Sequence, residues 1–241
     1  MQAILSGTGL VKSYGRLRAV DGVDIAVQPG EALGIVGPNG AGKTTLFGAL
    51  AGAFPLSAGE IRLDGAVITP LPAPRRCALG IARTYQVPRP FLGMTVFENV
   101  QVAARAGGDL KTEASIDHAA QILGATGLRA MANRPAGALG LLDRKRLELA
   151  RALATRPRVI LLDEIGGGLT EGELDVLVAL ILTLKAQGLT IVWIEHILHA
   201  LLRVIDRLVC MAEGRILAQG SPRAVMDDAQ VRAAYLGSDP E

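Results

Sequence analysis

A glycine-rich segment near residue 40 constrains this chain more than any other part of its sequence. Residues 37–44 read GPNGAGKT and fit the pattern G-x-x-x-x-G-K-[ST], in which backbone N–H groups surround a phosphate. The three glycines allow the backbone to turn so that these groups point inward. Lys43 supplies a positive charge for the phosphates, and the Thr44 hydroxyl is a candidate Mg²⁺ ligand. A plain glycine-rich turn leaves the lysine unexplained.

The flanking sequence supplies the context that this motif requires. The apolar run Ala32–Val36 is a predicted buried strand, and Thr44–Ala51 is a predicted helix that points its positive N-terminal end at the phosphates. We therefore expect a nucleotide to bind here. The predicted phosphate-binding residues are Gly37, Pro38, Asn39, Gly40, Ala41, Gly42, Lys43, Thr44 and Thr45.

Short apolar runs alternate with helical patterns, which favours an α/β fold. Val159–Leu162 and, apart from Thr190, Thr190–Ile194 are apolar, as in central strands that are buried on both faces of a parallel sheet. Helices are predicted over Glu171–Gln187, where apolar residues recur at helical spacing, and over Ile197–Val204. A glycine, Gly188, follows the first of these helices and is a natural stop for it.

Two regions differ from this alternation. The N-terminal part predicts an antiparallel β subdomain, with sheet segments at Ala3–Val11, Val20–Gln28 and Glu60–Leu63. Residues 87–155 show helical patterns with no convincing strand, and prolines lie near both ends. We interpret this middle part as a helical subdomain inserted into a nucleotide-binding core of residues 1–86 and 156–241, within one domain of 241 residues.

Composition excludes several other classes of protein. The formal net charge is +2, from 25 basic and 23 acidic residues, so nucleic acid is not an expected partner. The longest uncharged stretch, Thr44–Gly59, has 16 residues and contains a proline, whereas a membrane-spanning helix needs roughly 20 apolar residues. The first ten residues lack the pattern of a signal peptide. The two cysteines share no metal-ligand spacing, which indicates a reduced, cytoplasmic protein.

An acidic pair follows the predicted strand Val159–Leu162. Ligands bind at the carboxyl ends of parallel strands. We expect Asp163 to hold Mg²⁺ and Glu164 to orient or deprotonate the attacking water, because phosphoryl transfer depends on positioning and charge neutralisation. The alternative is that the two carboxylates cap a helix. The phosphate-binding loop in the same chain favours the catalytic interpretation over this one.

Two single residues complete the candidate site. The Gln86 amide lies where the core meets the helical insert, and it is a candidate ligand of Mg²⁺ or of the attacking water. His196 follows the strand Thr190–Ile194 and is a candidate donor to the γ-phosphate. Taken alone, each has a structural interpretation, as a solvated glutamine and a buried histidine. His118 and His199 fall in helical patterns with no visible partner and receive only the structural interpretation.

In the order and spacing of these motifs, the chain resembles the ATP-binding subunits of ABC transporters across nearly its whole length. The resemblance rests on VKSYG, GPNGAGKTT, the loop at Gln86, LARAL before VILLDE, and WIEH. It implies a P-loop ATPase fold that binds ATP with Mg²⁺ and hydrolyses it. It also implies that Tyr14 stacks on the adenine, that Gln86 and Asp163 join Thr44 at the metal, and that Glu164, His196 and Gln86 serve catalysis.

The resemblance also implies partners and a location. These are transmembrane permease subunits, a second ATPase subunit arranged head to tail, and indirectly a substrate-binding protein outside the membrane, with this chain peripheral at the cytoplasmic face. Residues 80–100 and the segment VRAAYLG near the C-terminus are similar to ATPases of branched-chain amino-acid uptake. Pro88, Pro90, Phe91 and Leu92 are a candidate permease contact, the alternative being ordinary core of the insert.

One segment departs from the family pattern. LGLLD, residues 139–143, stands where the family has LSGGQ, a segment that contacts the γ-phosphate held by the opposing subunit. Gly140 offers no hydroxyl, Leu142 adds a side chain where close backbone approach favours glycine, and Asp143 adds negative charge. The hypothesis is that two copies form two weak composite sites and that an unlike ATPase subunit restores one. The alternative is that the backbone of this segment still supplies enough N–H donors to bind the γ-phosphate. Ile165 and Thr170 also differ from the family pattern, and the sequence suggests no physical reason for either difference.

Two other functions are alternatives to that of a transporter ATPase. A soluble ABC-type ATPase of DNA repair or translation requires a long coiled coil, a second nucleotide domain or a basic patch, and the sequence shows none of them. A nucleotide-dependent regulatory module without hydrolysis is favoured by the altered LGLLD segment, but the presence of Glu164 and His196 argues against it.

Overall fold

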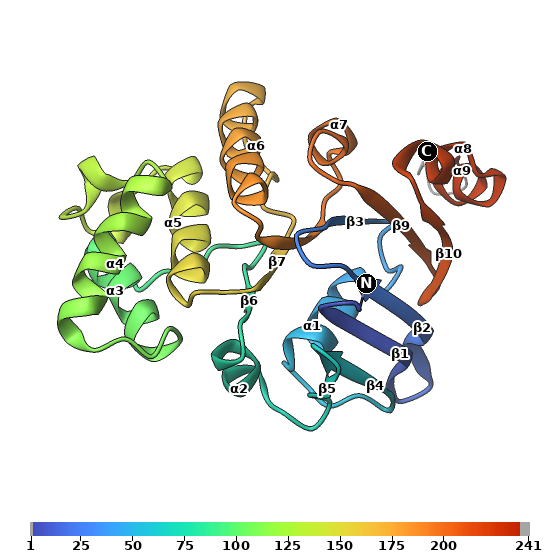
Figure 1. The fold of residues 1–241 in the computed structure, drawn as a ribbon. Helices are drawn as coiled ribbons and strands as arrows, with labels where there is room; N and C mark the ends of the chain where they lie inside the picture. Colours follow the sequence, from blue (N-terminus) through green and yellow to red (C-terminus); the bar gives the residue numbers. More distant parts are fainter. Residues whose placement is uncertain (1, 237–241) are drawn as a thin grey trace.

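Two β-sheets form the framework of the computed structural model, which describes residues 2–236 (Figure 1). The larger sheet has six strands in the order β10-β9-β3-β8-β7-β6. Its strands are β3 (Ala32–Val36), β6 (Ile81–Arg83), β7 (Val159–Asp163), β8 (Thr190–Ile194), β9 (Arg207–Ala212) and β10 (Arg215–Gly220). All neighbours are parallel except β9 and β10, so the carboxyl ends of β3, β6, β7 and β8 lie at one edge of the sheet.

The smaller sheet is antiparallel and has the order β2-β1-β4-β5. Its strands are β1 (Leu5–Tyr14), β2 (Leu17–Val27), β4 (Ala58–Leu63) and β5 (Ala66–Val67). Helix α1 (Lys43–Ala51) lies between the two sheets in Figure 1. One hydrophobic cluster joins the inner face of the smaller sheet, α1 and one face of the larger sheet. This packing fixes the start of α1 against both sheets.

Helices cover the opposite face of the larger sheet. They are α6 (Glu171–Ala186), α7 (Leu198–Leu202), α8 (Pro222–Asp227) and α9 (Ala229–Leu236). A second hydrophobic cluster joins them to the sheet and to α5. The strands β3, β7 and β8 are therefore buried on both faces, which explains why their sequences are apolar apart from Thr190 and Asp163 at strand ends.

Three further helices pack together beside strand β6, at the left of Figure 1. They are α3 (Val96–Ala106), α4 (Thr112–Ala125) and α5 (Leu141–Ala154), and they enclose a third hydrophobic cluster. Short 3₁₀ turns at Arg129–Met131 and Ala136–Ala138 lead into α5. Helix α2 (Ala73–Ala78) comes directly before β6 in the chain. The chain thus passes from β6 through these helices and returns to β7, its neighbour in the sheet.

The predicted α/β class, with a mostly parallel sheet and an antiparallel N-terminal sheet, is confirmed. Strands β3 and β8 have the predicted bounds. The predicted helix Ile197–Val204 is shorter, and α7 spans only Leu198–Leu202. The division at residues 87 and 155 stays a prediction. Gly237, the last residue of the VRAAYLG segment, lies outside the described residues.

None of the helices within residues 2–236 is both long enough and apolar enough to cross a membrane.

Candidate functional site

The glycine loop connects β3 to α1, as the sequence predicts. Gly42 has φ 97° and is the N-cap of α1. A Cβ atom on Gly42 would lie 2.1 Å from the carbonyl oxygen of Ala19, and one on Gly37 would lie 2.1 Å from that of Met211. Both positions therefore require glycine because neighbouring backbone comes too close for a side chain.

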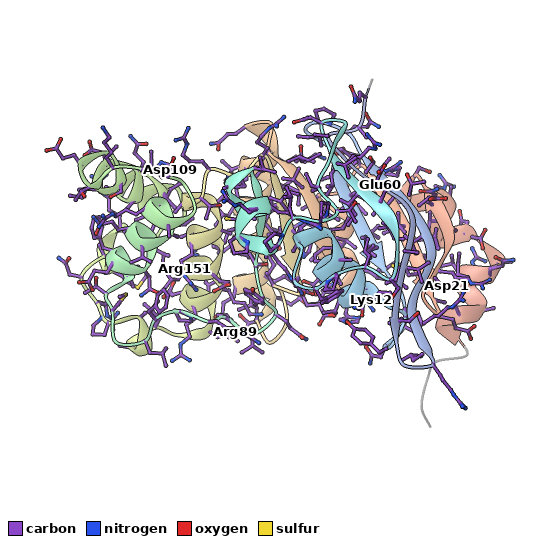
Figure 2. The ribbon with its side chains drawn as sticks, turned by 90° about the horizontal axis from the view of Figure 1, so that it is seen from below. Lys12, Asp21, Glu60, Arg89, Asp109 and Arg151 are labelled. Carbon is purple, nitrogen blue, oxygen red and sulfur yellow. The ribbon has the colours of Figure 1, made fainter. Side chains whose placement is uncertain are left out.

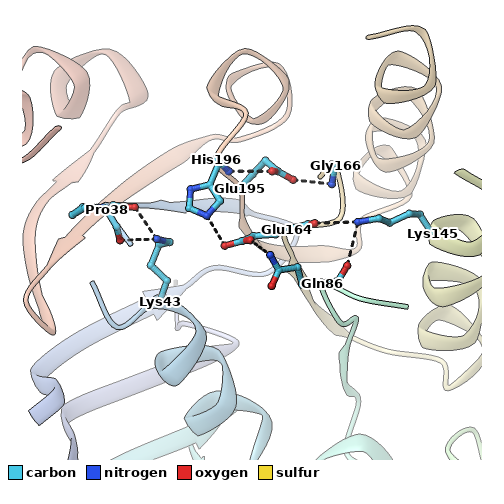
Figure 3. A network of polar contacts seen from close by, with 9 residues as sticks. Pro38, Lys43, Gln86, Lys145, Glu164, Gly166, Glu195 and His196 are labelled. Atoms are coloured by element: carbon cyan, nitrogen blue, oxygen red, sulfur yellow. Dashed lines mark hydrogen bonds and ion pairs between the residues drawn. The ribbon is translucent and has the colours of Figure 1, made fainter. Parts of the chain in front are cut away.

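The Lys43 ammonium lies against this loop. Its Nζ donates to the carbonyl oxygens of Gly37 at 2.7 Å and Pro38 at 3.0 Å (Figure 3). Burial lowers the pKa of Lys43, and the nearby Glu164 carboxylate acts in the opposite direction. A phosphate offers this ammonium a charged acceptor, and such hydrogen bonds are stronger than those to neutral carbonyls.

A cleft of about 390 Å³ opens over the loop. Tyr14 and Leu17, from the ends of β1 and β2, line one side of it. Glu164 also lines the cleft, and the Tyr14 side chain is exposed. The loop residues that line it are Asn39, Gly40, Ala41, Gly42, Lys43, Thr44 and Thr45. Gly37 and Pro38 lie behind them and contribute carbonyl oxygens to Lys43. The cleft thus combines an aromatic ring, a set of backbone N–H groups and a carboxylate.

Glu164 is the centre of a group of three polar side chains. Its Oε2 accepts a hydrogen bond from Gln86 Nε2 at 2.5 Å, and its Oε1 lies 2.6 Å from His196 Nε2 (Figure 3). The three residues follow β6, β7 and β8, which are adjacent in the sheet. The structure therefore brings together the three residues to which the sequence assigns catalysis.

Asp163 lies deeper than Glu164, at the end of β7. Its Oδ2 forms an ion pair with Arg83 Nη2 at 2.7 Å, and its backbone N–H donates to Thr84 Oγ1. Arg83 is a residue of this site that the sequence did not reveal. A signal was present, because a charged residue three positions before Gln86 follows the apolar pair Ile81 and Ala82.

The segment at residues 139–143 begins helix α5. Gly140 is the N-cap and makes no side-chain cap. Leu141 is exposed. Asp143 Oδ1 lies 3.2 Å from Arg146 Nη1, so its negative charge is balanced within the helix. This ion pair reduces the anion repulsion that the sequence predicts for Asp143.

One of the two remaining histidines has a partner that the sequence did not reveal. His199 Nε2 lies 3.3 Å from Glu171 Oε2 at the surface, and the structural interpretation of His199 stays a prediction. His118 lies on α4, and burial lowers its pKa. Neither histidine belongs to the cleft described above.

The predicted metal ligands fit a metal–nucleotide complex better than a bare ion. Among residues 2–236 there is no group of three or more His, Cys, Asp or Glu side chains that could hold a metal. Mg²⁺ is usually held by one or two carboxylates together with substrate phosphates and water. Thr44, Gln86 and Asp163 supply hydroxyl, amide and carboxylate oxygens, which are suitable hard donors.

The family model described as "ABC transporter" matches residues 20–166, which include the loop, Gln86 and the acidic pair. This chain belongs to that family. It is an ATPase subunit, and the interpretation as a module without hydrolysis is therefore not retained. A second model, "Branched-chain amino acid ATP-binding cassette transporter", matches residues 215–241 of this ABC ATPase.

Two curated relatives of this ABC ATPase are similar along nearly their whole length. It is 39% identical over 249 residues to the high-affinity branched-chain amino acid transport ATP-binding protein BraF of Pseudomonas aeruginosa, covering 97% of this chain and 98% of the relative. It is 37% identical over 251 residues to LivG of Escherichia coli, which carries the same description, covering 98% of both.

Solved structures agree with the fold of this ABC ATPase. A crystal structure of an ABC transporter ATP-binding cassette in its ADP conformation has a TM-score of 0.89 and 33% identity, covering 98% of this chain and all of the other. A nucleotide-free cassette has a TM-score of 0.88 and 31% identity, covering 97% and 99%.

Proposed function

We propose that this ATPase powers an importer of branched-chain or related amino acids and is bound peripherally at the cytoplasmic face of the membrane. The observation that carries the proposal is the near full-length similarity to BraF and LivG. The match of residues 215–241 to a branched-chain amino acid model supports the same substrate class. Substrate choice belongs to the permease and to a binding protein outside the membrane.

The proposed reaction uses the cleft above the loop. Tyr14 stacks on the adenine and the loop N–H groups bind the phosphates. A water oxygen attacks the γ-phosphorus and gives its proton to Glu164, and the bond to the β–γ bridging oxygen breaks to release ADP and phosphate. Gln86 and His196 fix the Glu164 carboxylate through the contacts described above.

Magnesium is the cofactor that this reaction requires. Thr44, Gln86 and Asp163 would hold Mg²⁺ together with the nucleotide, and the ion supplies neutralisation of the phosphate charge. Lys43 contributes a further positive charge from the protein itself. Its ammonium is already held at the loop by two carbonyl oxygens.

The proposed permease contact combines the apolar cluster Pro88, Pro90, Phe91 and Leu92 with a groove between α2, β6, α3 and α5. The volume of the groove is about 320 Å³, and Tyr85, Glu148 and Arg151 are among the residues that line it. The apolar residues that follow Gln86 extend this surface, and Tyr85, Val87, Phe91, Leu92 and Met94 are all exposed. The exposure of Phe91 and Leu92 favours a surface role over core of the insert for these two residues, whereas Pro88 and Pro90 are partly buried. An exposed apolar surface of this kind is typical of an interaction site.

Arginine side chains border the proposed permease contact. The Arg151 guanidinium lies 5.2 Å from the Phe91 ring and its Nη1 donates to the Arg89 carbonyl. Figure 2 shows Arg89 and Arg151 at the helical end of the molecule, well away from Lys12 and Asp21. The Arg89 guanidinium lies 5.0 Å from the Tyr85 ring. Such contacts hold aromatic side chains in place at the surface.

The proposed second ATPase subunit differs from this chain. Two copies placed head to tail would present Gly140 and Leu142 to each other's nucleotides, where a hydroxyl and a close backbone approach are expected. The Asp143–Arg146 ion pair removes part of the charge penalty, but it supplies no new donor for phosphate. The altered segment therefore supports a heterodimer in which the partner contributes the better contact.

Uptake in the native host tests the amino-acid proposal. Deleting the gene for this chain should abolish high-affinity uptake of radiolabelled leucine, isoleucine or valine. The wild-type chain and the surface variant Arg62→Gln should restore uptake, whereas Lys43→Ala should not. Unchanged uptake of all three amino acids after deletion would contradict the proposed substrate class.

Hydrolysis assays test the heterodimer. The assembly captured from native membranes through a tag on this chain should contain permease subunits and a second ATPase. The purified chain alone should hydrolyse ATP more slowly than the assembly, and Leu142→Gly should raise the rate of the chain alone. Rapid hydrolysis by the chain alone, with no gain from Leu142→Gly, would contradict an unlike partner.

A further inference from the structure

Two buried charged side chains lie beside Glu164 without contacting its carboxylate. Lys145 on α5 is 4% exposed and Glu195 at the end of β8 is 2% exposed. Within residues 2–236, neither forms an ion pair. Burying a charge is costly unless hydrogen bonds compensate for it, so the contacts that these two residues make require explanation.

Lys145 contacts the backbone of both Gln86 and Glu164. Its Nζ donates to the Gln86 carbonyl oxygen at 3.2 Å and to the Glu164 carbonyl oxygen at 3.3 Å (Figure 3). These are the two residues whose side chains meet at 2.5 Å. The Lys145 ammonium therefore links the backbone at Gln86 to the backbone at Glu164, and so fixes the distance across which the two side chains meet.

Glu195 contacts a second point of the same turn. Its Oε2 accepts from the Gly166 N–H at 2.9 Å, and its Oε1 accepts from the His196 N–H at 3.0 Å (Figure 3). A Cβ atom on Gly166 would lie 2.9 Å from Glu195 Oε2, so the carboxylate is packed closely against this backbone. Glu195 thus joins the Glu164 turn to the His196 backbone.

The turn between these two charges has an uncommon backbone conformation. Glu164 has φ 47°, in the left-handed region that residues with a side chain seldom adopt. Such conformations persist where surrounding contacts determine them, and they cluster at active sites. The Glu164 N–H is also bonded, at 2.9 Å, to the Ile194 carbonyl. The Glu164 carbonyl accepts from the Gly167 N–H at 3.4 Å and from Lys145, and the Gly166 N–H donates to Glu195, so the two charged side chains add to the backbone contacts that hold this turn.

We propose that Lys145 and Glu195 are positioning residues for ATP hydrolysis, which hold the Glu164 turn between them and make its geometry depend on where helix α5 lies. Lys145 reaches the turn from α5, the helix that begins with the altered LGLLD segment and whose Arg151 lines the proposed permease contact. Displacement of α5 by a partner therefore moves the ammonium relative to Gln86 and Glu164. This inference rests on the proposed role of Glu164 as the base.

The test measures kcat and KM for MgATP in the complete assembly, purified from native membranes. Lys145→Met removes both hydrogen bonds with little change in length, and Lys145→Arg keeps a charged donor. We expect Lys145→Met to lower kcat by roughly 10- to 100-fold, because small misplacements of a catalytic group have effects of this size. KM should stay within about threefold, and Lys145→Arg should recover most of kcat. Glu195→Gln, which leaves one N–H without an acceptor, should lower kcat in the same way.

Lys185 supplies a matched control. Lys185 lies in the last turn of α6, at the end of that helix away from the Glu164 turn. Its Nζ also donates to a backbone carbonyl, that of Val204 at 2.7 Å. Lys185→Met should lower thermal stability as Lys145→Met does but leave kcat unchanged. If Lys145→Met does not fold, Lys145→Gln, whose neutral amide is one bond shorter than the lysine ammonium, takes its place, and its kcat should still fall below the wild-type value.

The outcomes separate this inference from the function on which it rests. Wild-type kcat in folded Lys145→Met, an equal loss in Lys145→Arg, or a rise in KM with unchanged kcat would each overturn the positioning role. Glu164→Gln is measured in parallel. If that variant hydrolyses ATP at the wild-type rate, the assignment of the base is wrong. If it is inactive while Lys145→Met is fully active, only the positioning role is wrong.

Discussion

Arg83 Nη2 lies 2.7 Å from Asp163 Oδ2, and this ion pair joins the ends of the neighbouring parallel strands β6 and β7. Both side chains are largely buried. The pair therefore balances the charge of a carboxylate that the proposed reaction places close to Mg²⁺. It also ties the strand that leads to Gln86 to the strand that ends at Glu164.

Replacing Arg83 with methionine should destabilise the protein, because Asp163 is left as a buried charge without its partner. We expect the free energy of unfolding in urea to fall by about 3 kcal/mol. Arg62→Gln is the control, since Arg62 pairs with Glu60 at the surface with both side chains nearly half exposed. Its effect should be about 0.5 kcal/mol or less. Equal losses in the two variants would contradict a special role for burial.

Lys43→Ala should weaken ATP binding strongly. The ammonium is held at the loop, and losing charged hydrogen bonds to phosphate removes about 3 kcal/mol, which weakens binding about 100-fold. Isothermal titration of the purified chain with MgATP measures this. Lys185→Ala, whose side chain contacts Val204 and Asp206 instead, should bind ATP normally. Normal affinity in Lys43→Ala would remove the basis for placing phosphates at this loop.

Glu164→Gln should separate binding from hydrolysis. Loss of the base should lower kcat by about 1000-fold, while ATP affinity changes little. Since ATP then persists in the site, a closed ATPase dimer should accumulate and be visible by light scattering after gel filtration. Glu171→Gln, at an exposed carboxylate that pairs with His199, is the control. Unaltered hydrolysis by Glu164→Gln would transfer the role of base to another residue.

The strands that the sequence predicts well are those whose apolar runs are bounded by glycine or acidic residues. β3 and β8 are of this kind. β6 spans only Ile81–Arg83, and a run of three residues carries no usable periodicity. Its place at the edge of the sheet nevertheless decides where Gln86 lies. Local sequence therefore predicts the central strands but not the short strand that completes the site.

The candidate site shows the same division. Glu164, Gln86 and His196 are predicted as functional residues, but their contacts depend on the strand order β8-β7-β6, which no local pattern determines. Lys145 is one of several charged residues on α5, where charged and apolar residues are interspersed. Its burial arises only when α5 packs against the segments that carry Gln86 and Glu164, so sequence alone does not distinguish it from a solvated lysine.

Thr170, which the sequence left without an account, is the N-cap of α6. Its Oγ1 accepts from the Glu173 N–H, and Glu173 Oε2 accepts from the Thr170 N–H, so the two form a capping box. Thr170→Ala should lower the free energy of unfolding by about 1 kcal/mol. Thr170→Asp should be close to neutral because aspartate also caps helices. Thr183→Ala is the control and should cost less, because this hydroxyl in the last turn of α6 only donates to the Ala179 carbonyl of its own helix. A loss in Thr170→Asp equal to that in Thr170→Ala would contradict the capping role.

The two cysteines should differ in reactivity. Burial raises the pKa of the Cys210 thiol to about 11, and its side chain is fully buried in β9. Cys77 on α2 is only partly buried. Because the thiolate is the reactive form, iodoacetamide at pH 9 should label Cys77 and leave Cys210 unlabelled in the folded protein. Mass spectrometry of peptides from the native and the urea-unfolded chain measures both sites.

The raised pKa of Cys210 also makes stability depend on pH, in a direction that can be worked out. Between pH 9, where an exposed thiol ionises, and pH 11, the unfolded chain releases the Cys210 proton while the folded chain retains it. The unfolded state therefore binds fewer protons, and stability falls as pH rises through this window. Cys210→Ala lacks this contribution, so its free energy of unfolding should decline less than that of the wild type between pH 8 and pH 10.5. Cys77→Ser should follow the wild type. If Cys210→Ala and the wild type decline in parallel, ionisation of Cys210 does not contribute to the loss of stability.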